Sequence, residues 1–247
     1  MRYMMLIHHD DAAMAAADQK QLWAVYAAFT KGWSEVGDEG VPEIAGEALW
    51  LGRLIVSLLP AEPEAKGMLA LMLYAESRRA ARRDAAGAYV PLERQDTSLW
   101  DDSLIRLAES LLRDANKAGP TGRYQLEAAI QSAHTARRLA GQDNWRAIVA
   151  LYDHLLARTH SPVVVLNRAV ALAELDGPAA ALAAIAPLAG DKRMQSYQPY
   201  WAALGHLRAA TGDKGPAIEA LTIAIGLTTD PAVRSYLHGR ISALQDG

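Results

Sequence analysis

The stretch Tyr200–Pro231, YWAALGHLRAATGDKGPAIEALTIAIGLTTDP, predicts two helices joined by a tight turn. Trp201, Leu204 and Gly205 open the first helix, and Gly212 stands where the turn is expected. The second helix carries apolar residues at helical spacing: Ala217, Leu221, Ala224 and Leu227. The small residues Gly205 and Ala217 allow the two helices to approach closely, with Trp201 and Leu221 filling the space between them.

The W-x2-L-G spacing followed by a glycine turn resembles a tetratricopeptide (TPR) unit, a helix pair of about 34 residues. Two features depart from that pattern. Arg208 stands where an aromatic residue is usual, and Pro231 lies about two residues late. The alternative is an ordinary amphipathic αα-hairpin.

Further helix pairs are expected upstream, because one pair cannot bury its apolar face alone. Val163–Ala189 reads as a helix, a turn at Asp176-Gly177-Pro178 and a second helix. Arg123–Leu139 and Asn144–Arg158 form another apolar-periodic pair. Residues 123–247 therefore predict TPR-like helical repeats, with Ala232–Leu244 as the capping helix.

The composition narrows the class of protein. The chain has 247 residues, which suits one large or two small domains, and 51% of them are hydrophobic, with abundant alanine. The net charge of -3 gives no indication of nucleic-acid or membrane binding, so we expect no direct DNA contact. The lack of cysteine excludes disulfides and thiolate chemistry. No apolar run approaches the roughly 18 residues of a membrane span. We therefore expect a cytoplasmic protein without cofactor or metal.

Residues 1–42 predict a strand over 2–7 and an amphipathic helix over Gln19–Val36. A lone strand leaves backbone groups unpaired, so it must pair elsewhere. Pairing with the same strand of a second copy would make a homodimer.

Residues 43–117 predict a helical domain with helices at Ala45–Leu59 and Glu64–Arg83. Ser98 and Asp101 have capping-box spacing for a third helix that runs to about Lys117. The predicted fold is thus all-α, a helical domain plus a TPR-like αα-hairpin superhelix, with a short N-terminal β-strand/helix appendage.

The opening MRYMMLIHHDD, with FTKGWSEVGDEG at the end of the first helix, resembles the start of the YCII-related, or DGPF, family of small dimeric α+β proteins. The resemblance ends after about 45 residues, and the remaining strands of such a domain are missing. It implies that a His/Asp pair, here His8 or His9 with Asp10, could act in acid–base catalysis. The alternative is a polar strand terminus.

Residues 45–245 resemble the C-terminal extension of one group of extracytoplasmic-function (ECF) sigma factors. The resemblance rests on GRLIVSLLPAEPEAKGMLALMLYAESRRAARRDAAGAYVPLERQDTSLWD, GRYQLEAAIQSAH, DNWRAIVALYDHLL and SPVVVLNRAVALAELDGPAAAL, in the usual order. Nothing resembles sigma region 2 or the helix-turn-helix of region 4. The resemblance therefore implies an interaction module without promoter recognition, with a sigma core or RNA polymerase as a possible partner. The two resemblances together suggest that the chain arose by a natural fusion of two neighbouring genes. The product of such a fusion either keeps a function or is vestigial.

Three residue groups are candidate sites. Tyr124, Gln125, His134, Asn167 and Arg168 fall on first helices of the predicted repeats, whose concave face holds extended peptides in TPR arrays; Asn167 and Arg168 could instead join adjacent repeats. Arg78, Arg79, Arg82 and Arg83 could bind an anionic partner, or could pair with Glu76, Asp84 or Glu93 at a helix end. Gln95, Asp96, Trp100 and Asp101 could contact a missing sigma domain, or could simply cap a helix over a buried Trp.

The sequence thus predicts a non-enzymatic protein-interaction module. The alternatives are a small YCII-like enzyme and a vestigial fusion.

Overall fold

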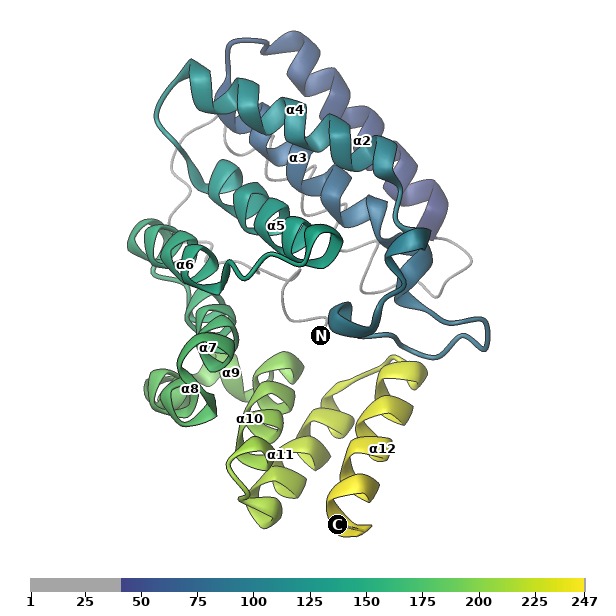
Figure 1. Ribbon diagram of the computed structural model, residues 1–247, viewed down its shortest axis with the longest axis vertical. Helices are drawn as coiled ribbons and strands as arrows, with labels where there is room; N and C mark the ends of the chain where they lie inside the picture. Colours follow the sequence, from purple (N-terminus) through teal and green to yellow (C-terminus); the bar gives the residue numbers. More distant parts are fainter. Residues whose placement is uncertain (1–40, 247) are drawn as a thin grey trace.

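The computed structural model describes residues 41–246, and these residues form an all-helical protein (Figure 1). Within this range no strand forms, and the only β contact is a single bridge between Arg83 and Tyr89. The all-α prediction is confirmed for this part of the chain. The predicted strand at 2–7 and the helix Gln19–Val36 lie outside the described residues.

The first group of helices packs around α3 (Pro63–Ser77). Its neighbours are α2 (Val41–Leu58), α4 (Asp102–Ala118) and α5 (Arg123–Ala140). Because α3 is enclosed on several sides, most of its residues are buried, including Met68, Met72 and Tyr74. This explains why α3 shows an almost continuous apolar run instead of a one-sided stripe.

The N-terminus of α5 docks against α3 through glycines and one carboxylate. The Glu64 carboxylate accepts hydrogen bonds from the backbone N–H groups of Tyr124 and Gln125, at 2.9 and 3.1 Å. It thereby caps α5 from another helix. A Cβ at Gly67 would lie 2.7 Å from the Gln125 nitrogen, and one at Gly122 would lie 2.2 Å from Glu64 Cδ. A side chain at Gly67 would meet the backbone of α5 and force these helices apart, whereas one at Gly122 would displace the Glu64 carboxylate from its capping position.

The remaining helices follow as successive hairpins. They are α6 (Trp145–Thr159), α7 (Pro162–Asp176), α8 (Pro178–Ile185), the short α9 (Lys192–Gln195), α10 (Gln198–Ala210), α11 (Lys214–Leu227) and α12 (Pro231–Asp246). Each longer helix packs against the next along the chain. Gly177 and Gly212 take φ values of 90° and 88° at the two predicted turns, a conformation that favours glycine. The helix pairs are confirmed, whereas their TPR-type superhelical arrangement remains a prediction.

The α10–α11 hairpin has the predicted close approach. A Cβ at Gly205 would lie 2.7 Å from Leu221 Cγ and 3.1 Å from the Ala217 carbonyl oxygen. Ala217 and Leu221 are both buried. The two helices of this stretch therefore pack closely at the small residues Gly205 and Ala217, as the sequence predicts.

The chain returns on itself, so that the segment after α3 lies beside α12 (Figure 1). The Arg83 guanidinium pairs with the Asp230 carboxylate at 2.8 Å. The rings of Tyr89 and Tyr236 meet edge to face, with centroids 5.5 Å apart. We call these two contacts the clasp. It joins the first group of helices to the last helix.

Candidate functional site

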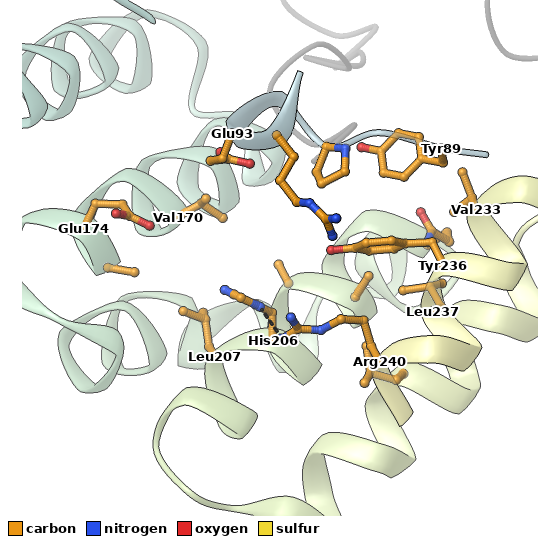
Figure 2. A pocket seen from close by; sticks show the side chains of 17 residues that line it. Tyr89, Glu93, Val170, Glu174, His206, Leu207, Val233, Tyr236, Leu237 and Arg240 are labelled. Carbon is orange, nitrogen blue, oxygen red and sulfur yellow. Dashed lines mark hydrogen bonds between the residues drawn. The ribbon is translucent and has the colours of Figure 1, made fainter. Parts of the chain in front are cut away.

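A cavity of about 300 Å³ lies beside the clasp, where the segment that follows Tyr89 faces the last helices (Figure 2). Its walls come from residues 89–94, from α7, from α10 and α11, and from α12. Segments far apart in the sequence thus build one site. Its volume is at the lower end of the range for cavities that bind small ligands or peptide side chains.

The inner wall of the cavity is apolar. Ala203 and Leu207 of α10, Leu221 of α11, and Val233 and Leu237 of α12 are all buried and line it. Such a surface gains free energy by covering an apolar group, at about 25 cal/mol for each Å² removed from water.

Polar groups surround this apolar wall. In Figure 2, Glu93 and Glu174 lie toward one side, and Tyr236 and Arg240 lie toward the other. Arg240 Nη2 lies 3.2 Å from His206 Nδ1. A guanidinium only donates hydrogen bonds, so Nδ1 must accept and the proton of the neutral ring sits on Nε2. Desolvation and the Arg240 charge lower the pKa of His206, which favours this neutral form.

The charged side chains of the lining form few hydrogen bonds or ion pairs among the described residues. No hydrogen bond or ion pair joins Glu93, Arg94 or Glu174 to another side chain there, and His206 is the one recorded partner of Arg240. The Gln198 amide nitrogen, also in the lining, is buried without a hydrogen-bond partner. An apolar cavity with several polar groups at its edge has the character of a binding site.

The residues predicted to hold a peptide are mostly in the interior, and this corrects the prediction. Tyr124, Gln125, His134 and Asn167 are 4, 0, 1 and 1% exposed, so a partner cannot touch them in this structure. Arg168 reaches the surface, where it pairs with Asp153 of the preceding helix. Helical spacing placed these residues on the correct helices, but four of the five side chains lie on faces that pack against neighbouring helices.

These buried groups instead form the polar interior of the α5–α7 region. Burial and nearby arginines lower the pKa of His134 to about 3, and its ring packs edge to face against Trp145. Burial raises the pKa of Glu127, although Arg123 donates to it at 2.7 Å. Both amide atoms of Asn167 lack a partner within the described chain. None of these groups reaches the cavity.

The four predicted arginines do not form one exposed stripe, because α3 ends at Ser77 and not near Arg83. Arg78 turns inward, where its guanidinium donates to Gln131 at 2.5 Å. Arg79 pairs with Glu76 at 2.6 Å, and Arg82 donates to the Ala75 carbonyl. Arg83 forms the clasp with Asp230. The anionic-partner patch was therefore wrong as a continuous surface, and the alternative of internal pairing describes the arrangement better.

The segment Gln95–Asp101 closes the first group of helices. Asp101, not Ser98, caps α4: its carboxylate accepts from the Ser103 and Leu104 N–H groups at 2.9 and 3.1 Å. Asp96 caps the short turn Thr97–Leu99 in the same way. Trp100 is buried under Arg78, and Arg138 donates to the Gln95 carbonyl. This segment thus matches the alternative of a capped helix over a buried Trp.

Two further features concern the described residues alone. Between residues 41 and 246 no group of three or more His, Asp or Glu side chains could hold a metal ion. No helix in that range combines the length and apolarity needed to cross a bilayer. His8, His9 and Asp10 lie outside the described residues.

Comparison with known proteins gives limited similarity. The sequence profile of a family of unknown function (DUF6596) matches residues 19–116, a range that crosses the predicted boundary between residues 42 and 43. An uncharacterised protein of Rhizobium meliloti (strain 1021) is 39% identical over 222 residues. That match covers 89% of this chain and 52% of the relative, so the chain spans about half of the relative's length. No solved structure matches.

Sequence analysis did not identify the cavity residues. His206 belongs to no motif of the sequence, and Tyr236 lies inside the predicted capping helix Ala232–Leu244. Arg94 and Arg240 belong to no sequence motif. They line the same cavity only because the segment after α3 returns to α12.

Proposed function

We propose that the protein is a non-enzymatic interaction module that captures an extended segment of a partner protein in the cavity beside the clasp. The observation that carries this proposal is the combination of a buried apolar wall with charged groups at its edge, of which Glu93, Arg94 and Glu174 form no ion pair with another described side chain. An apolar side chain of the partner would fill the cavity, and its backbone would meet the polar edge. Partner capture of this kind biases the partner between free and engaged states.

The resemblance to the C-terminal extension of ECF sigma factors indicates the class of partner. A sigma core or RNA polymerase is the first candidate, and a TPR-like superhelix would present the cavity on its inner face. The longer relative supports this idea, since the matched region is one part of a larger protein there. By the same resemblance, this chain works through protein contacts and not through promoter DNA.

A displayed library of random decapeptides tests the binding function. Purified chain should enrich peptides with a shared apolar anchor. The variant Ala173→Trp places a large ring in the lining from α7, where Ala173 is only partly buried, and should abolish enrichment.

The matched control is Ala180→Trp. Ala180 is also partly buried in a helix, α8, but does not line the cavity. It should enrich the same peptides as the unaltered chain. Circular dichroism and thermal melting confirm that both variants fold. No enrichment by the unaltered chain, or equal enrichment by Ala173→Trp, would contradict the proposed function.

A further inference from the structure

We propose that the segment captured in the cavity carries a carboxylate next to its apolar anchor, and that Arg240 binds this carboxylate. This inference rests on the proposed function and adds the chemical class of the ligand. It follows from the hydrogen-bonding capacity of the cavity edge and from the positions of its charges.

The first step is the state of Arg240. A guanidinium has five N–H donors, and among the described residues Arg240 uses one contact, to a neutral imidazole nitrogen. No carboxylate pairs with it there. Arg240 is only partly exposed and lies beside an apolar wall, where an ion pair is less screened than at an open surface.

The second step is an excess of donors in the lining of the cavity. With Nδ1 of His206 accepting from Arg240, its Nε2–H is left as a donor. The Gln198 amide nitrogen is a further donor without a partner, and Arg94 adds a second guanidinium to the lining. A ligand satisfies these donors by supplying hydrogen-bond acceptors, and a carboxylate supplies more acceptor sites than any neutral group.

The third step is the position of the acidic side chains. Glu93 and Glu174 lie across the cavity from Arg240 (Figure 2). They repel a carboxylate placed near them and accept hydrogen bonds from N–H groups. A peptide fits both sides at once, because it offers backbone N–H groups as well as the carboxylate. A simple fatty acid leaves Glu93 and Glu174 without donors.

Synthetic versions of the peptide enriched from the decapeptide library test the inference. The peptide is made with a free C-terminus, with a C-terminal amide, and with each Asp or Glu replaced by Asn or Gln. Binding is measured by fluorescence anisotropy. At least one neutralised version should bind about tenfold or more weakly, as expected for loss of a charge-assisted hydrogen bond. Which version weakens distinguishes a terminal from a side-chain carboxylate.

The variant Arg240→Gln locates the effect. It should bind the acidic peptide about tenfold more weakly and no longer distinguish it from the neutralised version, and Arg240→Lys should restore part of the difference. Arg146→Gln is the control, because it removes one positive charge from an exposed position on α6, away from the cavity.

The two proposals fail in different ways. If every neutralised peptide binds as well as the acidic one, or if Arg240→Gln keeps the preference, the carboxylate inference is overturned while the binding function stands. If the unaltered chain enriches no peptide at all, both are overturned.

Discussion

At the scale of single residues, the ionisation of His134 makes stability depend on pH. It is buried against Trp145, and its pKa falls to about 3 from an ordinary value near 6.5. Below pH 6.5 the unfolded chain therefore binds a proton that the folded chain does not. Stability is full above that pH and decreases by up to about 1.4 kcal/mol for each pH unit below it, until the pH approaches 3.

The variant His134→Phe should remove most of this acid dependence, because phenylalanine keeps the ring packing but cannot be protonated. Urea denaturation between pH 7 and pH 5 measures the effect. The unaltered chain should lose stability over this range and the variant should lose less; His206, whose pKa is also lowered, accounts for a remaining slope. His238→Phe, at an exposed position, serves as the control and should keep the full dependence. Equal slopes in all three proteins would exclude this role for His134.

At the scale of helices, the α10–α11 hairpin depends on Gly205. A methyl group there would meet Leu221 at 2.7 Å and the Ala217 carbonyl oxygen at 3.1 Å. Gly205→Ala should therefore lower the free energy of unfolding by about 1–2 kcal/mol, despite the better helix propensity of alanine.

Gly226→Ala in α11 is the matched control, because nothing lies within 4 Å of its added Cβ. It should be neutral or stabilising by about 0.5–1 kcal/mol. The opposite ranking would show that the two helices can separate without cost.

The same scale shows what the sequence could predict. The turns at Gly177 and Gly212 and the close approach at Gly205 follow from local patterns, and the structure has them. The C-terminal end of α3 and the start of α4 were missed, because Arg78 turns inward to a residue of α5 and Asp101, not Ser98, is the cap of α4. The predicted peptide site at Asn167 failed for a related reason. Which face of a helix is buried depends on neighbours that its own periodicity does not specify.

At the scale of the whole molecule, the clasp connects residues that are 147 positions apart. The Arg83 and Asp230 side chains are 28 and 14% exposed, so their pair is better protected from water than most surface pairs. Arg83→Gln should lower the free energy of unfolding by about 1 kcal/mol and should increase hydrogen exchange in α12.

Arg106→Gln is the control for this prediction. It removes an exposed pair with Asp102, so it should change stability by less than about 0.5 kcal/mol and leave hydrogen exchange in α12 unaltered. Unchanged exchange in Arg83→Gln would show that the clasp does not hold α12.

The clasp and the cavity share side chains, since Tyr89 and Tyr236 contact each other and also line the cavity. Opening the clasp would take away one wall of the cavity. Ligand affinity and clasp closure are then thermodynamically reciprocal: whatever factor closure adds to the affinity, the bound ligand adds to the closure constant. Through this reciprocity, an occupant of the cavity would change how firmly the first helices hold the last one, and a force or partner that pulls α12 away would release the occupant.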